Sequence, residues 1–318
     1  MHERTVAAGP TASQPNMMER PQVLLTGATG YVGGLLLPLL ERRSTAVRCL
    51  ARNPDKIRRG GDSTQVVRGD VLDAASLDAA LQGIDTAYYL VHLMAGAKDF
   101  ERDDRQAAVN FARAARQSAV KRIIYLGGLG DDADPELSPH LRSRHEVGKI
   151  LRDSGVETIE FRAGMVVGAG SLSFQLLKSL TDRLPVMLCP KWLSTPTQPI
   201  AVDDVLAYLS AAAELPAGAS RIFEIGGTDV VTYSDLIREY ARLKHLRRLL
   251  ISVPVLTPYL SGLWLALVTP AGFEVGRHLI EGLKNPTVVR DRSALSEFSI
   301  RPRGVREALE KAILSDQP

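Results

Sequence analysis

A glycine-rich turn between an apolar run and a helical pattern constrains this fold more than any other feature. The run QVLLTG (22–27) predicts a buried strand, and YVGGLLLPLLERR (31–43) predicts a helix. Gly27 would permit a tight turn, Gly30 would let a pyrophosphate approach the backbone, and Gly33 would let the helix pack close to the strand. Because a helix N-terminus offers unpaired N–H groups, the turn predicts a phosphate site. The residues predicted to form it are Gly27, Thr29, Gly30, Tyr31, Val32 and Gly33.

Strand and helix patterns alternate through the first half of the chain. Further strands are predicted at 46–52, 64–70, 86–92 and 121–128, and further helices at 74–82 and 99–119. Strands separated by helices form a parallel sheet with right-handed crossovers and helices on both faces. The sequence therefore predicts an α/β fold with a Rossmann-type, doubly wound parallel sheet. Pro38 conflicts with the first helix, so we expect either a kink there or a helix held by packing.

The pattern divides the chain into three parts. Residues 1–20 are rich in Pro, Ser, Thr and Gly and lack the apolar core of a secretory signal, so they predict a disordered tail. Residues 21–160 contain the predicted Rossmann domain. Beyond Gly155 the elements are short and do not repeat. They predict a smaller, substrate-facing C-terminal lobe at 161–318 that is interleaved with the sheet.

Composition excludes several classes of protein. The 318 residues are 45% hydrophobic and 24% charged, as in an ordinary globular protein that can bury a sizeable core. A net charge of +3, without a basic run interleaved with aromatics, gives no reason to expect nucleic-acid binding. The two cysteines and six scattered histidines do not predict a disulfide framework or a metal site. We expect a cytoplasmic protein.

Residues 249–270 carry no charge, but Pro254 and Pro258 interrupt them. The uninterrupted part from Tyr259 to Thr269 is shorter than the roughly 20 apolar residues that cross a bilayer. A buried or pocket-lining helix is the favoured prediction, and a peripheral membrane contact through 253–269 is the alternative.

The end of the second strand indicates which dinucleotide binds. An acidic residue there would bind the ribose of NAD, whereas an arginine suits the 2′-phosphate of NADP. Arg52 occupies this position in LARNPDK, so we predict NADP(H) rather than NAD(H). Asp70 and Val71 follow the third predicted strand. Asp70 would accept a hydrogen bond from the adenine amino group or would cap the next helix.

An ordered set of motifs resembles the extended and atypical short-chain dehydrogenase/reductases, especially the NmrA-like branch and its relatives among complex I accessory subunits. The motifs are TGATGYVGG, LARNP, GDVLD, LVHLM, AVNFARAARQSAVKRIIYLGGLG, LRDSGVETIEFRAG and QPIAVDDVLAYL, within about residues 21–235. The resemblance implies that the backbone at His92 and Leu93 passes the cofactor. It also implies that Asn110 orders a water or a carbonyl near the active site, and that Ala163 and Gly164 lie beside the nicotinamide.

The residues that active relatives use for proton transfer are replaced. In those relatives a serine, a tyrosine and a lysine four residues later form the catalytic set. Here Gly127 and Gly128 stand where the serine would be, and counting back from LRDSG puts His140 at the tyrosine position and Arg144 at the lysine position. A second alignment pairs His145 with Lys149, but it breaks the spacing to LRDSG.

Residues four apart share a helix face, so His140 and Arg144 could both reach the cofactor. Arg144 would hold the nicotinamide ribose, and its charge would oppose an imidazolium at His140. Three alternatives follow: His140 acts as a base or hydrogen-bond donor, Tyr89 or a water supplies the proton, or no chemistry occurs. The predicted function is NADPH-dependent reduction of an apolar small molecule, at an activated C=C, a C=N or a quinone. The alternative is a non-catalytic redox sensor or assembly factor.

Overall fold

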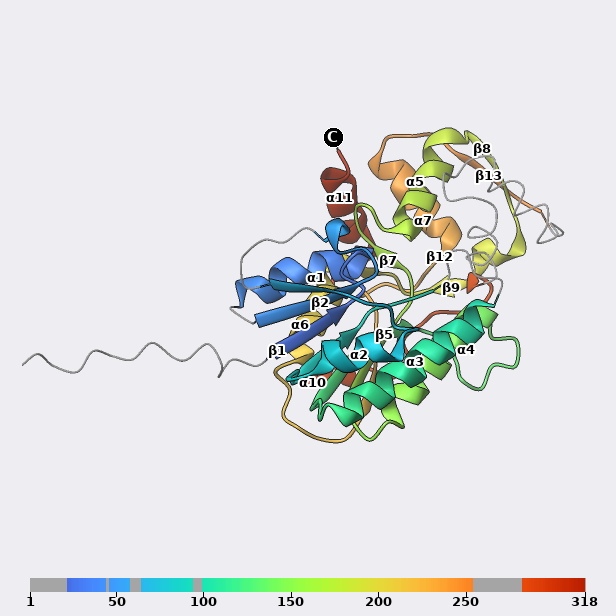
Figure 1. Cartoon of the computed structure of the whole chain (residues 1–318). Coiled ribbons are helices and arrows are strands. Elements are labelled where there is room, and N and C mark those ends of the chain that lie inside the picture. The colour runs from blue at the N-terminus through green and yellow to red at the C-terminus, as the bar shows by residue number, and fades with distance from the viewer. Residues whose placement is uncertain (1–21, 44–45, 58–63, 94–98, 254–281, 318) are drawn as a thin grey trace, which may run out of the picture.

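A parallel sheet forms the centre of the protein (Figure 1). The computed structural model describes residues 22–43, 46–57, 64–93, 99–253 and 282–317. Within these ranges the sheet has seven strands in the order β11-β6-β5-β4-β1-β2-β3, and all neighbours are parallel. The strands are β1 (Gln22–Thr26), β2 (Ala46–Ala51), β3 (Thr64–Arg68), β4 (Thr86–Tyr89), β5 (Arg122–Gly128), β6 (Glu157–Ala163) and β11 (Arg221–Ile225).

Helices cover both faces of this sheet (Figure 1). One face carries α1 (Tyr31–Arg42), α6 (Val202–Ala212) and α10 (Ser293–Glu297), and the other carries α2 (Ala74–Leu81), α3 (Phe100–Gln117) and α4 (Pro139–Arg152). Strand residues alternate between the two layers, so Leu25 and Tyr88 pack in the first core, whereas Leu24 and Tyr89 pack in the second.

A smaller group of elements has its own apolar core. Phe174 and Leu177 pack there with Leu236, Tyr240 and Leu309. The elements are β7 (Val166–Val167), α5 (Leu172–Arg183), β8 (Val186–Cys189), η3 (Lys191–Ser194), β9 (Pro196–Thr197), β10 (Ile200–Ala201), β12 (Val231–Thr232), α7 (Tyr233–Leu243), β13 (Leu249–Ser252) and α11 (Val305–Ser315). A short η2 (Pro54–Lys56) follows β2.

The predicted α/β Rossmann-type sheet is confirmed. The helix α1 runs through Pro38, and Leu36, Leu37 and Leu40 are buried on either side of it. Packing therefore stabilises this helix across Pro38, which is the second of the two outcomes expected from the sequence. The boundary predicted at residue 160 falls inside β6, and β11 later returns to the edge of the same sheet. The C-terminal part is thus interleaved with the sheet.

Two predictions lie outside the described residues. They are the tail at 1–20 and the part of the apolar stretch from 254 to 270. Among the helices that the structure describes, none is long and apolar enough to cross a membrane.

The chain changes direction across the sheet at β1. It continues to β2 on one side, whereas β4 lies on the other side. The Thr26 hydroxyl links β1 to β4 here, because it donates a hydrogen bond to the Tyr88 carbonyl at 2.9 Å. In open parallel sheets a crevice forms at the carboxyl end of the strands where the order reverses, and ligands bind there.

Candidate active site

A cavity of about 380 Å³ lies at the carboxyl ends of β1, β2, β3 and β4. It is lined by all but four of the predicted site residues: Gly27, Thr29, Gly30, Tyr31, Val32, Gly33, Arg52, Asp70, Val71, His92, Leu93 and Arg144. We refer to it as the nucleotide cavity. The remaining four, His140, Ala163, Gly164 and Asn110, lie elsewhere.

The geometry of the glycine turn fits a dinucleotide. Gly27 has φ +78°, and a Cβ there would lie 2.4 Å from the Leu90 carbonyl oxygen. A Cβ at Gly33 would lie 2.2 Å from the Gly27 carbonyl oxygen, so α1 packs directly on the turn. The helix begins at Tyr31 without a side-chain cap and without an acidic residue in its first turn. Its N-terminal amides therefore suit an anionic diphosphate.

A second cavity of about 300 Å³ adjoins the first. The two share His92, Leu126 and Arg144, so these residues mark a junction between them. Apolar side chains dominate the walls of the second cavity, which we refer to as the apolar cavity. They include Leu141, Met165, Leu177, Leu180, Leu193, Leu236 and Ile237. His140, Ala163 and Gly164 also line it.

Arg144 ties the strand ends together at this junction. Its guanidinium donates to the carbonyl of Leu126 and, at 3.5 Å, to that of Val91. It also lies 5.1 Å from the centroid of the Tyr125 ring, and the Tyr125 hydroxyl donates back to the Arg144 carbonyl at 2.9 Å. A permanently charged guanidinium can hold a ribose or an anion here, but it cannot act as a proton donor.

His92 forms a pair with a buried carboxylate at the same junction. Its Nδ1 lies 3.2 Å from Oδ2 of Asp104, which is 2% exposed. Asp104 also accepts hydrogen bonds from the Leu93 amide at 3.0 Å and from the Ser143 hydroxyl at 3.0 Å. The rings of His92 and His140 are 4.9 Å apart, measured between centroids. The carboxylate thereby fixes one edge of the His92 ring.

The charges around this pair set its protonation. Burial and the charge of Arg144 lower the pKa of His92 from 6.5, more than Asp104 raises it. Burial raises the pKa of Asp104, but the bonds from His92 and Leu93 and the charge of Arg144 together hold it below its ordinary value. Asp104 is therefore ionised, and Nδ1 of His92 carries the proton that it accepts. In a neutral ring, Nε2 is then the unprotonated nitrogen.

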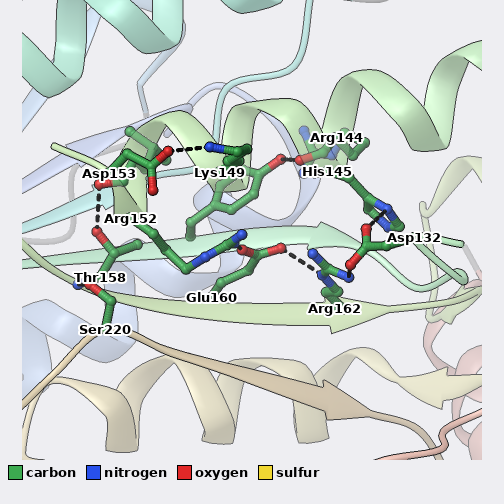
Figure 2. Close-up of polar contacts among 12 residues, drawn as sticks. Asp132, Arg144, His145, Lys149, Arg152, Asp153, Thr158, Glu160, Arg162 and Ser220 are labelled. Carbon is green, nitrogen blue, oxygen red and sulfur yellow. Dashed lines mark hydrogen bonds and ion pairs between the residues drawn. The ribbon is translucent and has the colours of Figure 1, made fainter.

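The second alignment considered for the catalytic pair places its residues elsewhere. His145 and Lys149 line an outward groove and not the apolar cavity. Nε2 of His145 lies 3.0 Å from the Gly128 carbonyl, and Nδ1 lies 2.6 Å from Asp132. Lys149 is exposed and pairs with Asp153 (Figure 2). His140, and not His145, therefore lines the apolar cavity.

His145 belongs to an ion-pair network between α4 and β6 (Figure 2). Asp132 also pairs with Arg162 at 2.8 Å, and Arg162 pairs with Glu160 at 2.7 Å. Glu160 is fully buried and also pairs with Arg152. Each charge of the network thus meets an opposite charge, which is what makes its burial tolerable.

The structure places three further residues for which the sequence suggested a role. Asn110 lines neither cavity; its amide donates to the carbonyls of Val71 and Leu72, so it supports the wall of the nucleotide cavity from α3. Asp73 caps α2, whereas Asp70 accepts from the Leu72 amide and faces the nucleotide cavity. Tyr89, suggested as an acid, is buried against Phe111 and lines neither cavity, and burial raises its pKa.

The sequence interpretation overlooked Asp104, Ser143 and Trp192. Asp104 was detectable, because it falls in the apolar spacing of Phe100, Ala107 and Phe111 along α3. Ser143 carried no such signal. Trp192 lines the apolar cavity, and within the described part of the chain its buried Nε1 has no hydrogen-bond partner.

Comparison with known proteins agrees with this geometry. Residues 27–168 match the model of the NAD(P)H-binding family. The chain is 32% identical over 135 residues to a (4-alkanoyl-5-oxo-2,5-dihydrofuran-3-yl)methyl phosphate reductase of Streptomyces griseus, a match that covers 42% of this chain and only 44% of that relative. It is 27% identical over 267 residues to a ceramide reductase of Caulobacter vibrioides, covering 81% of this chain and 83% of the relative.

A solved structure shares the fold. An NADPH-dependent quinone oxidoreductase of Escherichia coli, complexed with NADPH, superposes with a TM-score of 0.68 at 19% identity, over 90% of this chain and 98% of the other. Residues 27–168 therefore resemble the NAD(P)H-binding family, and the chain shares the Rossmann-type fold of this solved structure.

Proposed function

We propose that this protein is an NADPH-dependent oxidoreductase that reduces an apolar small molecule. The observation that carries the proposal is the junction of the two cavities at His92, Leu126 and Arg144. A dinucleotide with its diphosphate on the amides of α1 would extend its nicotinamide to that junction. A substrate in the apolar cavity would then meet the reducing end of the cofactor.

The walls of the apolar cavity support an apolar substrate with at least one polar atom. Leucine side chains from α5, η3 and α7 line it. Two buried nitrogens on its lining, Nε1 of Trp192 and Nε2 of His92, have no hydrogen-bond partner among the described residues. A buried polar atom without a partner costs about 1–3 kcal/mol, so a substrate oxygen or nitrogen at these points would be favoured.

The preference for NADP(H) is supported by Arg52. This exposed residue directly follows β2 and lines the nucleotide cavity. Its planar guanidinium suits a 2′-phosphate better than a pair of ribose hydroxyls. When bound, the cofactor would supply the two reducing electrons, while the protein binds, orients and excludes water.

A non-catalytic sensor or assembly factor is the second candidate. It is favoured by the replacement of the usual serine, tyrosine and lysine by Gly128, His140 and Arg144. A Cβ at Gly128 would lie 2.6 Å from the end of the Leu141 side chain, which would have to shift to accept a serine. A protein that only binds the cofactor would lose no activity through this replacement.

NADPH oxidation by the full chain against quinones, enones and iminium ions distinguishes the two. We expect turnover above background with at least one apolar member of the panel. Leu236→Asp, which puts a charge into the wall of the apolar cavity, should abolish that turnover and leave NADPH binding intact. Tight NADPH binding without turnover of any class would favour the sensor.

A further inference from the structure

We propose that His92 and Asp104 form the proton-transfer pair of this site and that they extend its substrates to aldehydes and ketones on apolar molecules. The inference rests on the proposed oxidoreductase function. A carbonyl needs a proton donor when it is reduced, because its oxygen would otherwise become an alkoxide. The usual tyrosine is absent, and His92 stands where the two cavities meet.

The geometry of the pair is that of an oriented imidazole. Asp104 is held on three sides, by the Leu93 amide, the Ser143 hydroxyl and Nδ1 of His92. Such a carboxylate fixes the ring tautomer and stabilises the imidazolium when it forms. Neither ring nitrogen makes a geometrically ideal hydrogen bond among the described residues, but Nδ1 has its ion-pair contact with Asp104, whereas the buried opposite nitrogen, Nε2, has neither kind of partner there. It is therefore the atom left to exchange a proton with a ligand.

The proton balance of the reduction is simple. The carbonyl carbon takes a hydride from the reduced nicotinamide dinucleotide, which is thereby oxidised by two electrons. The C=O π pair moves to the oxygen, and the oxygen takes the Nε2 proton of the His92 imidazolium, which leaves a neutral ring with its proton on Nδ1. The neutral imidazole regains a proton from solvent. In the reverse direction Nε2 accepts the proton of the alcohol, while the oxidised dinucleotide accepts the hydride.

The groups that face His92 come from two helices. Asp104 on α3 favours the imidazolium, whereas Arg144 on α4 opposes it. His140, also on α4, lies against the ring. Because Nδ1 is engaged by a carboxylate, Asp104 is a positioning residue and His92 is the group that would touch substrate.

The first arm of the test is kinetic. An iminium ion needs only a hydride, whereas a ketone needs a hydride and a proton. We expect His92→Gln to lower NADPH-dependent reduction of an apolar ketone by about 10²–10⁴-fold more than it lowers reduction of the iminium ion. Asp104→Asn should act in the same direction. The matched control Asp132→Asn, in the other histidine–carboxylate pair, should change neither. Equal losses for both substrates, or no loss for the ketone, would overturn the inference.

The second arm does not depend on turnover. In ¹⁵N NMR spectra of the full chain, with signals assigned by His92→Gln, we expect wild-type His92 to carry its proton on Nδ1. We expect Asp104→Asn to disturb that tautomer, and NADP⁺ to shift the Nε2 signal. A His92 signal that is insensitive to both would overturn the pair. If the wild type reduces neither substrate class, the proposed function fails, and the NMR result still decides whether His92 lies at the nicotinamide.

Discussion

Two histidine–carboxylate pairs lie beside α4, and they differ in which nitrogens of the imidazole ring have a protein partner. Each nitrogen of His145 has a protein oxygen close to it: Oδ1 of Asp132 lies 2.6 Å from Nδ1, and the Gly128 carbonyl lies 3.0 Å from Nε2. His92 has Asp104 at Nδ1 only, and its Nε2 has no hydrogen-bond partner in the described ranges. A ring that is satisfied at both edges stabilises structure, whereas a ring with one edge held and one edge available can move a proton.

The two pairs also differ in their surroundings. His145 is joined through Asp132 to Arg162, and from there to Glu160 between α4 and β6 (Figure 2). His92 lies between two cavities. Burial lowers the pKa of both rings, so burial alone does not distinguish them. The difference lies in the hydrogen-bond partners.

The largest expected effect compares the two histidines directly. His92→Gln should lower apolar ketone reduction by about 10²–10⁴-fold, because the group that supplies the proton is lost. His145→Gln should retain reduction, because that ring lines the outward groove. Steady-state NADPH oxidation measures both. If His145→Gln folds fully but loses ketone reduction, the contrast between the two histidines is contradicted.

The next effect concerns stability. Glu160→Gln would leave Arg152 and Arg162 without their shared buried charge partner. We expect a loss of about 3–5 kcal/mol in the free energy of unfolding, measured by urea denaturation. Asp104→Asn should cost less, because the amide oxygen can still accept from the Leu93 amide and the amide nitrogen can donate to the Ser143 hydroxyl, which has acceptor capacity. The reverse order would contradict the structural role that we assign to the ion-pair network around Glu160.

Cofactor affinity gives a third contrast between the nucleotide cavity and the outward groove. Arg52→Ala should weaken NADPH binding by about 1–3 kcal/mol and NADH binding much less, since only NADPH carries the 2′-phosphate. Arg142→Ala removes a cation from the groove and should change neither affinity. Calorimetric titration measures these values, and equal losses for both dinucleotides in Arg52→Ala would contradict the NADP assignment.

The smallest effect is a shift in pH dependence. Carbonyl reduction requires the imidazolium of His92, whose pKa is lowered from 6.5 by burial and Arg144. Reduction should therefore fall about tenfold per pH unit above that lowered pKa. Asp104→Asn removes the charge that raises the pKa, so its profile should move to lower pH. Asp132→Asn should leave the profile in place.

Local patterns predicted the sheet and the phosphate turn, because both depend on residues close in sequence. Gly33 is required by its contact with the Gly27 carbonyl, and Gly27 by its own φ of +78°. The role of Asp104 depends on Ser143 and His92, which other elements bring to it. The role of Asn110 likewise depends on how α3 packs against the loop after β3. These long-range contacts have no counterpart in sequence spacing.

A crystal structure of the full chain with NADP⁺ most directly tests where the chemistry occurs. We predict that the diphosphate lies on the amides that begin α1 and that the nicotinamide ring contacts His92 and Arg144 at the cavity junction. A nicotinamide ring bound away from both residues, or a dinucleotide seated in the groove beside His145, would contradict this prediction.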